Sequence, residues 1–221
     1  MSSVESLVEA PSSLAERAYY AIREMIVSLR LRPGAVINER ALVESLGIGR
    51  TPVREALRRL AQERLVEVYP RRGMFVTTVE IRDLASLCEV RAALESQVAQ
   101  LAARRATDDD RAALRELVEE LDRHEQLDQP ALMAFDERIH RAVYRAAHNP
   151  FLEQTLEEYY VLALRIWHLA LDQASGLEAA VQSHRPLLTA IVDGDATAAG
   201  RFMRRHVDDF EQAMKRVLLG V

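Results

Sequence analysis

The N-terminal fold is decided by residues 46–60, which read LGIGRTPVREALRRL. Gly47 and a second glycine stand just before Thr51 and Pro52, and apolar residues then recur at helical spacing. Glycine commonly ends a helix in a left-handed conformation, while threonine as a cap and proline at the first helical position commonly open one. The segment therefore predicts the end of one helix, a tight turn, and a second helix that runs to about Arg64.

Further helical patterns precede this segment. Apolar residues recur at three- and four-residue spacing from Leu14 to Leu29, which predicts a first helix. Asn38 is a candidate N-cap for a short helix that ends at Leu46. The short helix, the glycine turn and the helix that follows form a helix-turn-helix pattern.

The helix after the turn has two distinct faces. Its apolar stripe consists of Val53, Ala56, Leu57 and Leu60, and its basic ridge consists of Arg50, Arg54 and Arg58. Arginines near the start of such a helix match the O6 and N7 acceptors of guanine in the major groove. Taken alone, however, Arg58 or Arg59 also fits an ordinary solvated surface.

A β-hairpin is expected after this helix. Residues 65–69 (LVEVY) and 74–77 (MFVT) have strand character, and the intervening residues 70–73 (PRRG) are typical of a turn. The tip of the hairpin carries Arg71 and Arg72, so it forms a basic wing that can lie beside DNA phosphates.

Charge divides the chain near residue 79. The 221 residues are 49% hydrophobic and 29% charged, which is typical of a soluble globular protein. Residues 1–79 hold 12 arginines and 9 acidic residues, a net charge of +3, so the remainder carries −8 of the total of −5. A basic module attracts polyanions such as DNA. We expect a flexible tail at 1–12, a winged helix-turn-helix domain at 13–79 and a second domain at 80–221.

Other features bear on the compartment. No stretch of 18 residues is free of charge, which argues against a membrane partner. Glu5 and Glu9 precede the first basic residue, the wrong order for a secretory signal. A lone cysteine, Cys88, fits a reducing compartment. A cytoplasmic protein is expected.

The second domain reads as helices with almost no strand signal. Six helices are expected, at 81–105, 107–127, 130–149, 151–173, 176–192 and 195–219. Their short connections imply an antiparallel bundle. The predicted fold class is therefore mainly α, a winged helix-turn-helix followed by an all-α antiparallel helical bundle.

Four possible metal ligands fall on three of these helices. Asp136 and His140 stand four residues apart and share one helix face, while His184 and His206 lie on the fifth and sixth helices. Carboxylate and imidazole donors on facing helices can hold a divalent transition metal. Because Asp and His at this spacing are also common without a metal, the spacing alone leaves both interpretations open.

The N-terminal motifs resemble the GntR family of bacterial transcription regulators. The matching residues are Pro33-Gly34, Asn38-Glu39-Arg40, the segment 46–60 and Gly73. The resemblance implies DNA contacts from Arg40, Arg50, Thr51 and Arg54, with Gly73 allowing close approach of the wing backbone. One departure is Arg64, which replaces the glycine usual before the first wing strand and would be strained in a left-handed conformation.

The second domain resembles the all-helical FCD ligand-binding domain of FadR-type GntR regulators, and six helices are similar to the VanR branch. The matching residues are Glu89-Val90-Arg91, Leu94-Glu95, Asp136 to His140, Asn149-Pro150, His184-Arg185 and His206. The resemblance implies a divalent metal ion on Asp136, His140, His184 and His206, with zinc preferred and nickel or manganese as alternatives. His124, His148 and His168 match no motif position and are interpreted as surface or capping residues.

A metal on one carboxylate and three neutral imidazoles keeps about one unit of positive charge. A small organic acid could bind to it as the effector, and Arg91 could pair with the same acid. Alternatively, Arg91 forms a structural ion pair with an acidic neighbour, and both interpretations stay open.

The resemblance implies a homodimeric regulator, by default a repressor, that binds an inverted-repeat operator in double-stranded DNA and responds to the effector. One alternative is a metal-dependent hydrolase, against which no dedicated general base is evident beside Asp136. In another, the metal itself is the signal or has a purely structural role.

Overall fold

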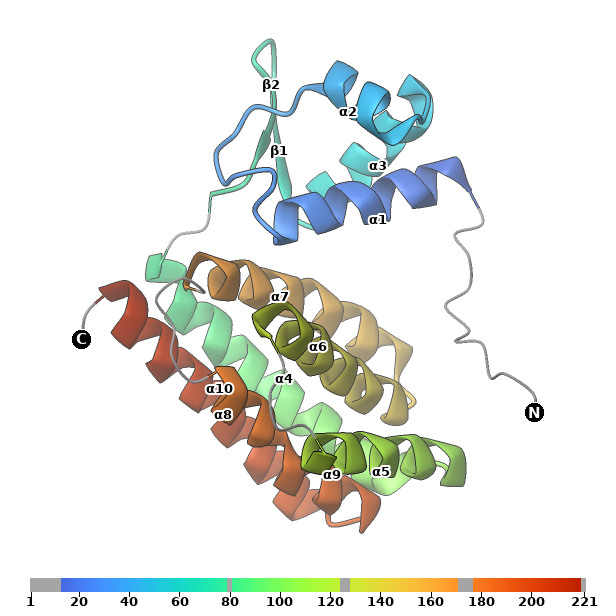
Figure 1. Ribbon diagram of the computed structural model, residues 1–221, viewed down its shortest axis with the longest axis vertical. Helices are drawn as coiled ribbons and strands as arrows, with labels where there is room; N and C mark the ends of the chain where they lie inside the picture. Colours follow the sequence, from blue (N-terminus) through green and yellow to red (C-terminus); the bar gives the residue numbers. More distant parts are fainter. Residues whose placement is uncertain (1–12, 79–80, 124–127, 171–176, 220–221) are drawn as a thin grey trace. The chain divides into compact units, whose positions relative to one another are not determined.

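The chain divides into two compact units, Met1–Val79 and Glu80–Val221 (Figure 1). The computed structural model describes residues 13–78, 81–123, 128–170 and 177–219. The tail predicted at residues 1–12 lies outside the described residues. Within those ranges, no helix is both long and apolar enough to cross a membrane.

Helices and a hairpin make up the first unit. They are α1 (Leu14–Val27), α2 (Glu39–Leu46), α3 (Arg50–Gln62), β1 (Val66–Tyr69) and β2 (Gly73–Val76). Helices α1 and α3 pack against each other, and Ile22 and Leu57 are among the fully buried residues they contribute to the core. The two strands pair in antiparallel fashion, with Val66 opposite Val76. This arrangement confirms the predicted winged helix-turn-helix.

Local signals set the helix ends around the turn. The Asn38 side chain accepts a hydrogen bond from the backbone N–H of Ala41, and Gly47 ends α2 with a φ of 63°. Arg64 follows α3 with a φ of 60°, and the next N–H, from Leu65, donates to the carbonyl of Leu60. The left-handed corner expected at Arg64 is therefore present, although the residue is not glycine.

The predicted start of α3 is wrong by two residues. The helix begins at Arg50, with Gly49 before it and no side chain capping the first turn, so Thr51 is not the cap. Pro52 consequently occupies the third helical position rather than the first. The N–H groups of the first turn have no partner inside a helix, so a proline there removes no helical hydrogen bond.

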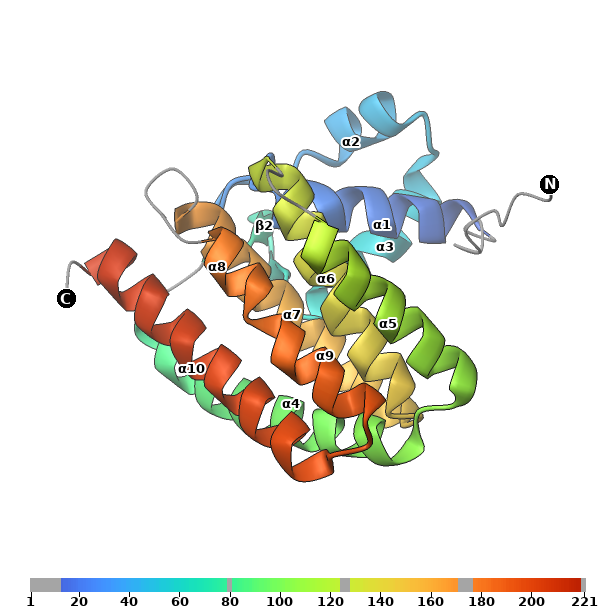
Figure 2. The same cartoon turned by 60° about the horizontal axis from the view of Figure 1, so that its bottom comes forward.

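The second unit is helical. A short 3₁₀ helix (Ile81–Asp83) is followed by α4 (Leu84–Arg105), α5 (Asp108–Arg123), α6 (Gln129–Ala146), α7 (Pro150–Ala170), α8 (Leu177–Gln182), α9 (His184–Val192) and α10 (Ala196–Leu219). Helices α4 and α10 run side by side, and α4 also packs against α6, α7 and α9 (Figure 2). The all-α bundle is confirmed.

One predicted helix is two. The expected helix over 176–192 breaks at Ser183, where α8 ends and α9 begins, so the described part of this unit holds seven α-helices rather than six. Ser183 donates a hydrogen bond from its hydroxyl to the carbonyl of Ala180, 2.6 Å away. The break places His184 in the first turn of α9.

Candidate DNA interface and metal centre

The residues expected to contact DNA lie on the surface of the first unit. Arg50, Thr51 and Arg54 occupy the first two turns of α3, Arg40 lies near the start of α2, and all four are exposed. A shallow depression on α3 is lined by Thr51, Arg54, Glu55 and Arg58. Basic side chains on an exposed helix beside a turn are the arrangement that major-groove reading requires.

Two of these arginines are held by carboxylates. The Nε atom of Arg54 donates to Glu39 at 2.7 Å, a contact that joins α3 to α2. The Nε atom of Arg40 donates to Glu44 at 2.8 Å within α2. The side chains of Arg40 and Glu44 are 81% and 64% exposed, so that pair contributes little to stability.

The wing turns at Pro70–Arg72, between β1 and β2. Arg71 has a φ of 63° and Gly73 a φ of 102°, and both Arg71 and Arg72 are exposed. Below the tip, the rings of Tyr69 and Phe75 meet edge to face with centroids 5.4 Å apart. The two-stranded hairpin therefore presents two guanidinium groups at its tip.

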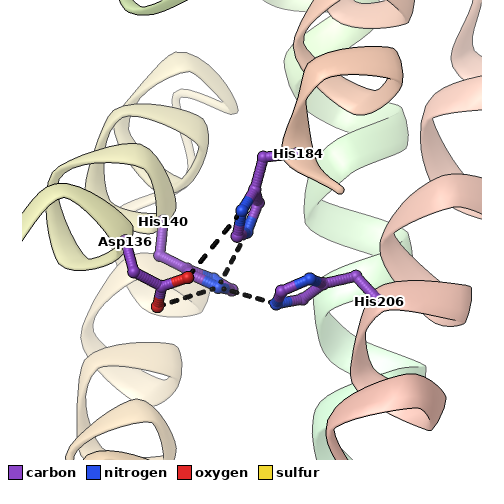
Figure 3. Close-up of side chains that lie close together, drawn as sticks. All are labelled: Asp136, His140, His184 and His206. Atoms are coloured by element: carbon purple, nitrogen blue, oxygen red, sulfur yellow. Dashed lines mark hydrogen bonds and ion pairs between the residues drawn. The ribbon is translucent and has the colours of Figure 1, made fainter. Parts of the chain in front are cut away.

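The four predicted metal ligands come together inside the second unit. Asp136 and His140 come from α6, His184 from α9 and His206 from α10, and all four side chains are buried. One ligand atom from each residue lies within 4.8 Å of those from the others. Figure 3 shows the side chains converging from the three helices.

The three imidazoles meet through their Nε2 atoms. The Nε2 atom of His140 lies 3.3 Å from that of His184 and 3.3 Å from that of His206. Two nitrogens bound to one zinc ion at a tetrahedral angle lie about 3.3 Å apart. The spacing of the nitrogens therefore fits a shared transition-metal ion.

Hydrogen bonds on the other side of each ring fix the tautomers. His184 Nδ1 lies 3.1 Å from the carbonyl of Val181, which can only accept. His206 Nδ1 lies 3.0 Å from the Ser183 hydroxyl, and that hydroxyl already donates its proton to Ala180. Each Nδ1 must therefore carry the proton, which leaves a lone pair on each Nε2.

The Nδ1 atom of His140 lies beside a carboxylate and a tyrosine hydroxyl. Its Nδ1 atom lies 3.1 Å from Glu95 Oε2 and 3.2 Å from the Tyr144 hydroxyl. Burial opposes ionisation of Glu95, but the charges of Arg91 and then His140 outweigh it and lower the pKa of Glu95 to about 2. The negative charge of Glu95 therefore lies beside the Nδ1 atom of His140, the position that carboxylates commonly occupy behind metal-bound histidines.

The Nε2 lone pairs of His184 and His206 thus both lie beside the Nε2 atom of His140. Burial lowers the pKa of His184 to about 4, and burial together with His184 lowers the pKa of His206 well below its usual value. These two imidazoles are therefore neutral near pH 7, the form that binds metal ions. A metal ion among the three Nε2 atoms would be attracted to these lone pairs.

Asp136 supplies the fourth donor. Its Oδ2 atom accepts a 2.7 Å hydrogen bond from the Tyr160 hydroxyl on α7, whose pKa is raised by burial and by the Asp136 charge. Its Oδ1 atom is buried and has no hydrogen-bond partner among the described residues. A buried carboxylate oxygen is costly to leave unpaired, so this atom also fits a metal ligand.

Arg91 lies next to this cluster in a buried ion pair. Its Nε atom donates to Glu95 Oε1 at 2.6 Å, one helical turn along α4, and the two side chains are 2% and 0% exposed. Its guanidinium carbon lies 5.2 Å from the centroid of the Phe210 ring. The structural ion pair considered for Arg91 is present, and its role toward an effector stays a prediction.

No role could be assigned from the sequence to the residues that orient the ligands. Glu95 and Tyr160 reach the cluster only through helix packing, and Ser183, which directly precedes His184, reaches His206 in the same way. Glu95 had one available signal, because it stands four residues after Arg91. Of the other histidines, His148 lies exposed at 2.7 Å from Asp110, and His124 is outside the described residues.

Comparisons with known proteins agree with these features. Residues 14–76 match the bacterial regulatory proteins of the gntR family, and residues 86–209 match the FCD domain. The chain is 34% identical over 200 residues to an HTH-type transcriptional regulator in an unstable DNA locus of Streptomyces ambofaciens, covering 88% of this chain and 84% of the relative. It is 23% identical over 218 residues to the HTH-type transcriptional repressor RspR of Escherichia coli K12, covering 97% and 94%.

A solved structure is also similar. E. coli McbR/YncC superposes with a TM-score of 0.81 at 25% sequence identity, covering 92% of this chain and 98% of that one. The family and these relatives are transcription regulators rather than enzymes. The chain therefore belongs to the GntR family and is a DNA-binding transcription regulator with a C-terminal FCD domain.

Proposed function

We propose that this regulator is a homodimeric repressor that acts in the cytoplasm and responds to a small organic acid bound beside a divalent metal ion. Repression is supported by the name of the relative RspR. A two-fold symmetric dimer of winged helices would bind an inverted-repeat operator, with one half-site for each α3.

The DNA contacts follow from the exposed basic side chains of the first unit. Arg50, Thr51 and Arg54 would enter the major groove, and Arg40 would contact the DNA backbone beside it. Arg71 and Arg72 on the wing would pair with phosphates, and Gly73 lets the wing backbone approach closely. Phosphate contacts position the protein, whereas base contacts give the sequence preference.

The metal site rests on one observation above the others. The Nε2 atoms of three histidines converge with a buried oxygen of Asp136 that has no hydrogen-bond partner among the described residues. We assign this site to zinc first, with nickel and manganese as alternatives, because imidazole and carboxylate donors suit all three. When bound, such an ion supplies positive charge and an open coordination position to an anionic ligand.

The effector is proposed to be a small organic acid because the metal ion and Arg91 would both attract a negatively charged ligand. Arg91 gives Nε to Glu95, so its terminal nitrogens are the donors that a carboxylate would use. Binding can change operator affinity only if the acid prefers one of two arrangements of the dimer.

The metal assignment is tested with the double variant His184→Ala/His206→Ala. Elemental analysis of protein exposed to zinc and then desalted should find about one zinc per wild-type chain and none in the double variant. The matched control is His148→Ala, which removes an exposed histidine of the same unit and should keep its zinc. Full zinc occupancy in the double variant would overturn the ligand set.

The role of the metal is tested by titrating zinc into chelator-treated protein while following its affinity for DNA. A change in affinity with zinc alone supports the metal as the signal. A change that needs both zinc and a carboxylic acid, such as acetate or citrate, supports the acid as the effector. Zinc that raises stability but never exchanges supports a structural role.

A further inference from the structure

The ion pair between Glu39 and Arg54 connects the two helices of the helix-turn-helix. Glu39 is the first residue of α2, and Arg54 lies one turn into α3. The bond runs from Arg54 Nε to a carboxylate oxygen of Glu39 at 2.7 Å, and the side chains are 58% exposed for Arg54 and 31% for Glu39. It joins residues 15 positions apart, unlike the pair of Arg40 and Glu44 within one helix.

The atom that makes this bond matters for DNA reading. Because Glu39 occupies Nε, the two terminal nitrogens of Arg54 remain, and the part of the chain that the structure describes offers them no other hydrogen bond. Two terminal nitrogens presented side by side match the paired O6 and N7 acceptors of guanine. A fixed guanidinium also loses less side-chain freedom when it binds.

The charge of Glu39 works in the opposite direction. A carboxylate on the surface that faces DNA repels phosphates and weakens binding to every sequence. An exposed ion pair adds little to folding stability, so stability gives no strong reason for this contact. The hydrogen bond from Arg54 to Glu39 should favour binding to the specific sequence, whereas the charge of Glu39 should weaken binding to all DNA. The two effects can therefore be separated by experiment.

We propose that Glu39 is a positioning residue for sequence recognition, which holds Arg54 in the orientation that reads a base pair and lowers affinity for unrelated DNA. This proposal rests on the DNA-reading role proposed for Arg54. Glu39 itself contacts no base. It raises the ratio of specific to non-specific affinity by acting on Arg54.

The experiment compares Glu39→Gln, Glu39→Asp and Arg54→Ala in the full-length protein. The preferred duplex is first obtained by selection of the wild-type protein on a library of random double-stranded DNA. Affinities for that duplex, for its single-base-pair variants and for an unrelated duplex are then measured by fluorescence anisotropy at two salt concentrations. Thermal unfolding of each variant shows whether the fold is kept.

The control is Glu55→Gln. Glu55 is exposed on the same helix as Arg54 and has no ion pair within the described ranges, so this variant removes an equal charge without releasing Arg54. Glu39→Asp keeps the charge but shortens the side chain by one methylene group, so it tests position alone. Together the variants separate the effect of the Glu39 charge from the effect of its hydrogen bond with Arg54.

We expect both Glu39 variants to lose preference, by about tenfold, at the same base pair that Arg54→Ala no longer reads. Glu39→Gln should also bind the unrelated duplex more tightly than wild type, whereas Glu55→Gln keeps the wild-type preference. Wild-type preference in Glu39→Asp, or an equal loss on both duplexes in Glu39→Gln, overturns the proposal. If Arg54→Ala itself keeps every preference, the DNA-reading role of Arg54 fails instead.

Discussion

Replacing Arg91 by methionine should strongly destabilise the second unit. The Arg91 and Glu95 side chains are 2% and 0% exposed, and their pairing atoms lie 2.6 Å apart. Removing one partner of a buried ion pair costs about 3–5 kcal/mol, because the other charge stays buried without compensation. In a unit of this size, that loss corresponds to a fall in Tm of about 10 °C.

The assay is urea unfolding of the full chain in the presence of a chelator. Trp167 is the single tryptophan, it is buried, and its ring lies 5.6 Å from that of Phe210, so its fluorescence reports on the second unit. The matched control is the double variant Arg91→Met/Glu95→Leu, which removes both charges and should recover most of the loss. A loss below about 1 kcal/mol in Arg91→Met, or a double variant as unstable as the sum of the single changes, would refute the reasoning.

Three further outcomes are expected. Arg54→Ala should weaken binding to the selected operator by about 1–3 kcal/mol in a fluorescence titration, and unchanged affinity would remove Arg54 from the interface. Arg64→Gly should stabilise the first unit by about 1 kcal/mol in thermal unfolding, because a left-handed arginine is strained; a decrease in Tm would contradict that strain. Free zinc at about 100 times its Kd should raise the unfolding free energy seen by Trp167 by about 2.7 kcal/mol, whereas an unchanged urea midpoint would show that no ion binds the folded state.

Much of the first unit could be predicted because its signals are local. Asn38 as a cap and Gly47 as a stop act within one helical turn, and both have the predicted roles. The corner at Arg64 is different, because its φ of 60° is one that arginine disfavours and the residue type argued against it. The cap predicted at Thr51 was wrong because the helix begins at Arg50, two residues before Pro52, so Thr51 lies inside its first turn.

Local signals account for only part of the second unit. Pro186, the third residue of α9, lacks the N–H that a continuous helix would pair with the carbonyl of Gln182, so it marks the break at Ser183 although the sequence prediction did not use it. The Ser183 hydroxyl contacts Ala180 and also His206 on the distant helix α10. The ligand residues could be named from the sequence, but the groups behind them could not. Glu95 reaches His140 only because α4 packs against α6, and such contacts depend on the tertiary fold.

The distribution of the four donors along the chain has a kinetic consequence. Asp136 and His206 are 70 positions apart, and their helices must all be docked before the donors meet. The complete set of donors therefore exists only once these helices are docked. Interactions that form after the transition state mainly slow unfolding and leave the folding rate unchanged. The lifetime of the assembled bundle, rather than the speed of its assembly, is the quantity that a bound ion would control.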